Sequence, residues 1–222
     1  MMSMAMKTQV QIDRLLTKVN LQISRVPLHA LQVALTEYWK SVLIESPKQE
    51  YGTISFLVGT TANITKVVAT ERFLEIWSNQ SSPVDTFSLL TQPILDKRLL
   101  NILGLSIEMM VVTKRFPAGY PEVMSGIKEP LKPILGRLEA DIKAEVEALG
   151  MRLYLRQGED NGLYTFDIAP FFEDPRRQLY LRLTSRRDGH IRSQGFRQSF
   201  LNHAELFNNL IKEVPSIILN YP

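Results

Sequence analysis

Seven arginines stand between Arg176 and Arg197, together with no lysine and one acidic residue, Asp188. A guanidinium group is a planar fork of donors that binds a carboxylate or a phosphate through two parallel hydrogen bonds. Arginine used without lysine therefore indicates recognition of an anionic group, and not positive charge alone. The next question is which elements of the chain would position these donors.

Three segments with alternating apolar side chains lie before this run or within it. They are Met151–Gln157, Leu163–Ile168 and Gln178–Thr184, and loops that carry glycine or proline separate them. This alternation predicts an antiparallel meander. The Asp-Gly pair that follows predicts a tight hairpin and a short fourth strand near Ile191–Phe196.

The predicted meander collects polar side chains on one face and apolar side chains on the other. A loop over Gln157–Gly162 would set a register that places Arg152 opposite Asp167 and Tyr154 opposite Thr165. This register decides which side chains share a face, since a slip of one residue would exchange the two faces. Arginines and tyrosines then interleave on the polar face. The residues predicted to bind an anion or a partner there are Arg152, Tyr154, Arg156, Tyr180, Arg182 and Arg197.

Two interpretations of this polar face stay open. In the first, aromatic rings stack on bases while guanidinium groups hold phosphates, or the same donors hold an acidic protein surface. In the second, the tyrosines pack beside arginine stems and Asp167 pairs with Arg152 or Arg182, which is the default for a polar sheet face. For function, we predict a non-enzymatic binding or regulatory protein that holds an anionic partner, nucleic acid or acidic protein, on this face.

Two other functions compete with this prediction. A divalent-metal nuclease would use Asp167, but the next strand offers no second carboxylate and no lysine to complete a metal site. A structural or oligomeric assembly protein would instead use Tyr38, Trp39 and Trp77 as an interface, and the partner would then be a second copy of the chain.

No motif predicts a catalytic residue, a metal or a cofactor. Gly59 and Lys66 lack the further glycine of a phosphate-binding loop. The three histidines, His29, His190 and His203, have no metal-ligand spacing. An enzyme is therefore the less favoured class.

The composition is that of a globular protein, with 222 residues, 45% hydrophobic residues and a net charge of +3. Cysteine is absent, which excludes a disulfide framework and favours a reducing, cytoplasmic setting. The longest apolar run, Ile102–Val112, is too short to span a bilayer and contains Glu108, so no membrane association is predicted.

The N-terminal half is predicted to be mainly helical. Apolar residues spaced i, i+3, i+4 and i+7 favour a helix over Ile12–Ile23, although Leu21 lies off this stripe and keeps a strand open. The other expected elements are a helix from Pro27 to Val42, a strand over Tyr51–Val58, a helix capped within Thr60–Asn63 and running through Trp77, and a helix over Val84–Leu105. Ile107–Val112 is expected to be a strand, with the end of a buried helix as the alternative.

The C-terminal half is predicted to begin with a helix from Pro133 to Leu149 and to end with a helix from Asn202 through Val214. The predicted fold is a single α+β domain over residues 1–222, with a possible subdomain boundary at 116–132. That boundary would separate a mainly helical part, residues 1–115, from a part with the order α-β-β-β-(β)-α, residues 133–222. The sequence contains no internal repeat.

Overall fold

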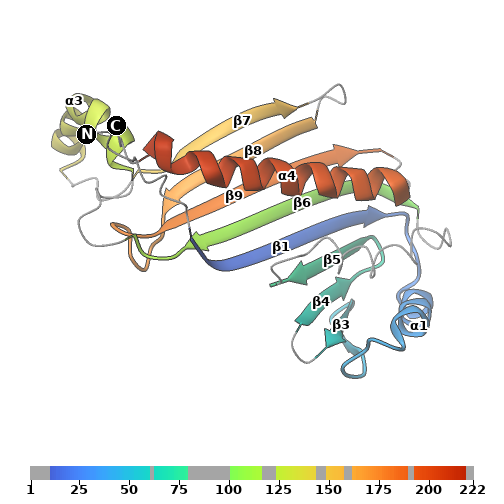
Figure 1. Cartoon of the computed structure of the whole chain (residues 1–222). Coiled ribbons are helices and arrows are strands. Elements are labelled where there is room, and N and C mark those ends of the chain that lie inside the picture. The colour runs from blue at the N-terminus through green and yellow to red at the C-terminus, as the bar shows by residue number, and fades with distance from the viewer. Residues whose placement is uncertain are drawn as a thin grey trace, which may run out of the picture.

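One antiparallel sheet of nine strands dominates the fold (Figure 1). The computed structural model describes residues 11–60, 63–79, 101–116, 124–143, 149–157, 162–189 and 193–218, and three helices accompany the sheet within these ranges. The strand order is β2-β3-β4-β5-β1-β6-β9-β8-β7. None of the helices in the described part of the chain is long and apolar enough to cross a membrane.

The central pair of the sheet is β1 (Ile12–Ile23) with β6 (Ile102–Thr113). On one side of this pair lie β2 (Lys48–Glu50), β3 (Thr53–Thr60), β4 (Asn63–Ala69) and β5 (Phe73–Ser78). On the other side lie β7 (Met151–Gln157), β8 (Gly162–Pro170) and β9 (Leu179–Asp188). The helices are α1 (Leu28–Trp39), α3 (Ser125–Ile142) and α4 (Ser193–Ile218).

The two sides of the sheet repeat one topology. In each half, a central strand (β1 or β6) is followed by a helix (α1 or α3) and then by a meander. The last strand of the meander (β5 or β9) pairs with the central strand of that half. The hydrogen-bond registers agree as well. The cross-strand row Phe56, Val67, Ile76 and Val19 corresponds to the row Leu153, Phe166, Leu183 and Met109. This repeat of backbone topology has no counterpart in the sequence.

The prediction of a mainly helical N-terminal half is wrong, and the chain from Ile12 to Ile23 is the central strand β1. Val19 and Leu21 are fully buried, and Ile23 is nearly so. These side chains follow a two-residue period into the core, while β5 and β6 bind both backbone edges of the strand. Pairing on two sides therefore prevails over the helical spacing of the leucines.

The helix predicted after Asn63 is also wrong, because this segment forms the hairpin β4–β5. The backbone N–H of Thr70 donates to the carbonyl of Phe73 at 2.8 Å, and the Thr70 hydroxyl accepts from the N–H of Phe73 at 3.0 Å. This turn contains no glycine or proline, so no turn signal marks it. Residues 84–100 of the next predicted helix lie outside the described residues, and residues 102–105 belong to β6.

The predicted fourth strand of the C-terminal meander is wrong. Residues 190–192 lie outside the described residues, and α4 already begins at Ser193 instead of near Asn202. Phe196 and Phe200 are buried one helical turn apart against the rest of the core, at 3% and 2% exposure. A helix that buries both rings is favoured over a fourth strand at the sheet edge.

The helix predicted from Pro133 to Leu149 begins earlier and ends earlier. It is α3, and both Pro130 and Pro133 lie inside it. Met124 precedes the helix in a left-handed conformation, with φ 67°, and is 2% exposed. Burial of the Met124 side chain thus accompanies the helix start, which the sequence pattern placed at the proline.

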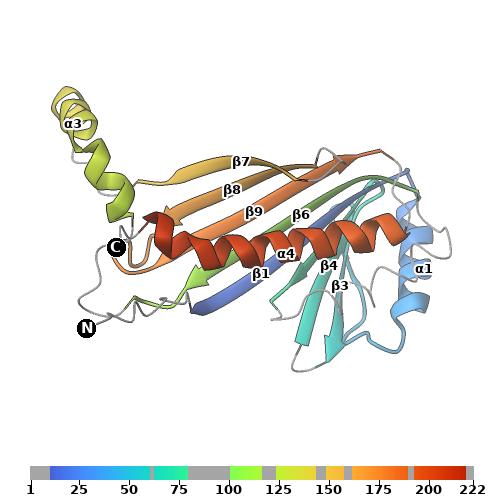
Figure 2. The same cartoon turned by 45° about the horizontal axis from the view of Figure 1, so that its top comes forward.

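The core lies on one side of the sheet, beneath α4 and α1 (Figure 2). We call this side the inner face, and it carries Val19 and Leu183. Phe166 meets Phe207 of α4 edge-on at 6.4 Å between ring centroids. The opposite side carries the alternate residues, and we call it the open face, because no described helix lies over it. The arginines and tyrosines of β7 and β9 belong to the open face.

Candidate functional site

Five of the six predicted site residues lie together on the open face. Arg152, Tyr154 and Arg156 alternate along β7, and Tyr180 and Arg182 alternate along β9. The strand β8 separates the two sets. It places Asp167 directly between Arg152 and Arg182, which confirms the predicted pairing of Arg152 with Asp167.

Arg197 does not join this face. It lies on α4, which packs against the inner face of β6 and β9, so the sheet separates it from the other five residues. Its side chain is exposed. The prediction that Arg197 belongs to the site depended on the fourth strand, and it is corrected together with that strand.

Asp167 is the centre of the charges on the open face. Arg182 donates to one carboxylate oxygen, Oδ2, through Nε at 2.9 Å and Nη2 at 2.7 Å. Arg152 donates to the same oxygen through Nη2 at 3.3 Å and to Oδ1 through Nε. Burial acts to raise the pKa of Asp167, but the hydrogen bonds from the two guanidinium groups outweigh it and hold the pKa below its usual value. The carboxylate is therefore ionised and fixes both arginines.

A second charge cluster lies at the equivalent place in the other topological half. Lys18 of β1 pairs with Glu75 of β5 at 2.8 Å, and its ammonium lies 4.3 Å from the ring centroid of Trp77. When the two halves are matched by their strand registers, Lys18 of the first half is equivalent to Glu108 of the second, and Glu75 is equivalent to Arg182. Arg182 and Glu108 also pair, at 3.4 Å. The two halves thus carry the same ion pair with its signs exchanged.

Alternating charges consequently cross most of the open face. Lys18 and Glu108 are direct partners in the central strand pair, so the two clusters meet there. From β5 to β7 the order is Glu75, Lys18, Glu108, Arg182, Asp167 and Arg152. Three acids balance three bases, so this row has no net charge. The raw number of arginines overstates how basic the surface is.

Several side chains beside this row remain available to a partner. Tyr154 is 67% exposed and Leu163 is 50% exposed. Arg156 is exposed and has no ion-pair partner among the described residues. Aromatic, apolar and cationic groups therefore adjoin one another at the β7–β8 edge of the open face.

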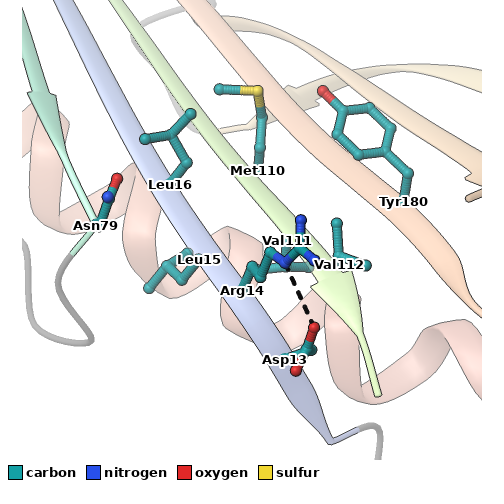
Figure 3. A pocket seen from close by; sticks show the side chains of 9 residues that line it. All are labelled: Asp13, Arg14, Leu15, Leu16, Asn79, Met110, Val111, Val112 and Tyr180. Atoms are coloured by element: carbon teal, nitrogen blue, oxygen red, sulfur yellow. Dashed lines mark ion pairs between the residues drawn. The ribbon is translucent and has the colours of Figure 1, made fainter. Parts of the chain in front are cut away.

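A hollow of about 480 Å³ lies over the ends of β1, β6 and β9 (Figure 3). Leu16, Met110 and Tyr180 rise from the same side of these three strands, which the register identifies as the open face. The lining is mostly carbon. Burial raises the pKa of Tyr180, so its hydroxyl stays protonated and can donate a hydrogen bond at neutral pH. The complete lining is Asp13, Arg14, Leu15, Leu16, Asn79, Met110, Val111, Val112 and Tyr180.

Two other arginines of the run from Arg176 to Arg197, Arg177 and Arg187, connect parts of the fold. Arg177 donates to the backbone carbonyl of Phe116 through Nε at 3.0 Å and Nη2 at 2.8 Å, which ties the end of β6 to the loop before β9. Arg187 of β9 donates to the hydroxyl of Ser199 on α4 at 2.6 Å. Arg186 pairs with Asp188 at 3.1 Å, and both side chains are exposed. Arg192 lies outside the described residues.

Sequence reasoning missed one polar pair within the core. The ring of His203 on α4 is fully buried, and its Nδ1 lies 2.8 Å from the hydroxyl of Ser185 on β9. Burial lowers the pKa of His203 to about 3. Nε2 has no hydrogen-bond partner among the described residues. The alternation of side chains along β9 indicates that Ser185 points inward. Predicting its contact with His203 would also have required the correct start of α4.

The residues proposed for the competing functions lie elsewhere. Trp39 is 1% exposed and packs on Phe56, while Trp77 lies under Lys18 on the open face, so the aromatic residues of the N-terminal half do not form one surface. Both oxygens of Asp167 accept hydrogen bonds from arginine. Within the described ranges, no three acidic, histidine or cysteine side chains gather to hold a metal ion. His190 lies outside those ranges, and His29 is exposed on α1.

The comparisons with known proteins add no relative. No protein-family model matches the chain, and no curated protein resembles it significantly in sequence.

Proposed function

We propose that this chain is a non-enzymatic, cytoplasmic binding protein whose open face holds an acidic surface of another protein. One observation carries the proposal: Tyr154 and Arg156 stand exposed beside Arg152 and Arg182, and Asp167 holds these two arginines in fixed positions. Each arginine keeps further N–H groups that Asp167 does not use. A carboxylate of the partner would meet donors that are already oriented.

The balance of charge favours a protein partner over nucleic acid. Nucleic acids bind through many cations that neutralise successive phosphates. The central row of the open face instead alternates in sign, and the cations Arg156 and Lys66 lie beside it without a carboxylate partner among the described residues. Interfaces between proteins are enriched in tyrosine, methionine and arginine, which are the residue types gathered here.

The hollow beside Tyr180 supplies a second element of such an interface. Its walls include Leu16, Met110 and Val112, and it is large enough for an apolar side chain of a partner. Arg182 lies next to Met110 in the strand register. A partner segment with an apolar residue next to an acidic residue would therefore engage the hollow and the arginines together.

The proposal can be tested with two fluorescent probes, a peptide that alternates glutamate and leucine and a single-stranded oligothymidine. Binding of the peptide should weaken about tenfold in Arg156→Ala and in Tyr154→Ala, since truncating an exposed interface anchor commonly costs more than 1 kcal/mol. Met110→Trp, which fills the hollow, should weaken it as well. Arg197→Ala is the matched control and should bind like the parent protein, because Arg197 lies on the other side of the sheet.

Three outcomes would contradict the proposal. If the three open-face variants bind the peptide as the parent does, the open face is not the binding surface. If oligothymidine binds more tightly than the peptide, with an affinity that falls steeply with salt, the partner is nucleic acid. Cleavage of the oligonucleotide in magnesium, lost in Asp167→Ala, would instead indicate a nuclease.

A further inference from the structure

The two topological halves differ in how well their outermost long strands are covered. On the inner face of β3, Ile54, Phe56 and Val58 are completely buried. Leu31, Leu35 and Trp39 of α1 are themselves buried, and Trp39 meets the ring of Phe56 at 5.2 Å. In the first half, the helix that follows the central strand therefore covers β3.

The equivalent strand in the second half is β7, and its inner face is only half-covered. By register, Met151, Leu153 and Leu155 correspond to Ile54, Phe56 and Val58. All three side chains on β7 are partly exposed. Since their counterparts are fully buried by a helix, an apolar strip along β7 lacks the cover that the repeat provides elsewhere.

The helix in the equivalent place is α3, and it does not lie over β7. Both views show it extending beyond the ends of β7 and β8 (Figures 1 and 2). Ile134 is 64% exposed and Leu138 is 45% exposed, and they lie one turn apart on the same side of the helix. One chain thus has both an exposed apolar patch on α3 and a partly exposed apolar strip on β7.

Its own contacts hold α3 in this outward position. Met124, just before the helix, is 2% exposed and belongs to the core, and Leu135 is 8% exposed. The helix also contacts α4. Turning α3 back over its own β7 would expose Met124 and Leu135, which would cost the hydrophobic free energy of their burial.

We propose that two copies of the chain associate by reciprocal contact, with the Ile134–Leu138 side of α3 in each copy covering the inner face of β7 in the other. The occupant is a second copy because one chain offers both complementary surfaces and its own anchors keep them apart. A two-fold axis makes each contact twice, as in other isologous dimers. This contact leaves the open face free, so it is independent of the proposed binding function.

The first test is the oligomeric state over a wide range of concentration, measured by sedimentation equilibrium. The parent protein should form a dimer, and Ile134→Glu with Leu138→Glu should weaken the dimer about a hundredfold, because charges replace the buried contacts. Val33→Glu is the matched control, since Val33 is 57% exposed on α1, the equivalent helix. A parent protein that stays monomeric throughout, or a dimer that the paired change leaves intact, would overturn the proposal.

A second test identifies the surfaces in contact. The chain has no native cysteine, so introduced cysteines can form disulfides only with one another. Chains carrying Ile134→Cys are mixed with chains carrying Leu153→Cys, oxidised and weighed by mass spectrometry. A mixed disulfide between the two chains supports the proposal, whereas its failure to form counts against it. Leu155→Cys serves in place of Leu153→Cys if that variant melts early. A third sample carries both cysteines in one chain. If it forms a monomer closed by an internal disulfide, α3 covers its own β7 and the proposal is wrong.

Discussion

Asp167 and Arg182 face each other across β8 and β9, and the guanidinium donates two hydrogen bonds to a single carboxylate oxygen of Asp167. Arg152 approaches the same carboxylate from β7. An acid between two bases serves the fold first, because it allows two arginines to lie within reach of one another. It serves binding second, because both donors then have fixed directions.

Replacing Asp167 by asparagine should lower the free energy of unfolding by roughly 1–2 kcal/mol, since two guanidinium groups would lose their counter-charge while staying close together. Urea unfolding followed by circular dichroism measures this change. Asp188→Asn is the control: Asp188 pairs with Arg186 at an exposed site and should contribute almost nothing. Equal effects of the two substitutions would show that the contacts of Asp167 add no more to the free energy of unfolding than an exposed ion pair does.

The same carboxylate should also affect stability in acid. The pKa of Asp167 is lowered by folding, so its contribution is fully present above the unfolded value of about 4 and is lost as the pH falls through the lower folded value. In Asp167→Asn, the decline of stability below pH ~4 should therefore be shallower than in the parent protein. An unchanged slope in that range would mean that the two arginines do not hold the carboxylate ionised.

His203 should make the protein sensitive to acid at a higher pH. Burial lowers its pKa to about 3, so between that value and about 6.5 the unfolded chain binds a proton that the folded chain does not. Stability should fall as the pH decreases through this window, by up to about 1.4 kcal/mol per pH unit. His203→Gln should flatten the dependence, whereas His29→Gln, at an exposed site on α1, should leave it unchanged. Melting temperatures between pH 7 and pH 4 provide the measurement.

Charge reversal at Lys18 tests the exchanged ion pairs of the two halves. Lys18→Glu would place an acid beside Glu75 and opposite Glu108, and it would remove the cation over Trp77. The expected loss of stability is about 1–3 kcal/mol, with part of it recovered when Glu75→Lys is added. Lys114→Glu, at an exposed site after β6, should cost much less. Full additivity of the two changes at Lys18 and Glu75 would exclude a coupled pair.

Arg177→Lys should destabilise the protein although it keeps the charge. The guanidinium makes two hydrogen bonds to one carbonyl, that of Phe116, and an ammonium cannot reproduce this fork. A loss of about 1 kcal/mol in urea unfolding is expected, against no clear change for Arg72→Lys at an exposed turn. A neutral result at Arg177 would show that the two hydrogen bonds to Phe116 do not contribute to stability.

The C-terminal meander could be predicted from sequence because each strand carries its own signal. Apolar residues alternate over Met151–Gln157 and Leu163–Ile168, and glycines mark the loop between them. Those signals also fixed the register that sets Asp167 between arginines. Five of the six site residues follow from that alternation alone.

The N-terminal half could not be predicted in the same way, because its strands depend on partners distant in the chain. β1 pairs with β6, which comes some ninety residues later, and adjacent Leu15 and Leu16 gave it a helical spacing. The β4–β5 turn lacks glycine and proline. At the other end, the helix start at Ser193 depends on the sheet that Phe196 packs against, so local sequence misplaced Arg197.

The central position of β1 and β6 has a consequence for synthesis of the chain. One edge of β1 has no native partner until β6 begins at Ile102, and its pairing is complete only at Thr113, although β3, β4 and β5 are complete well before. Such long-range pairing slows folding, because chain entropy is lost before contacts are gained. We therefore expect the seam between the two halves to close late, after each meander has formed on its own. A nascent chain halted before β6 would present an unpaired hydrophobic strand edge to chaperones.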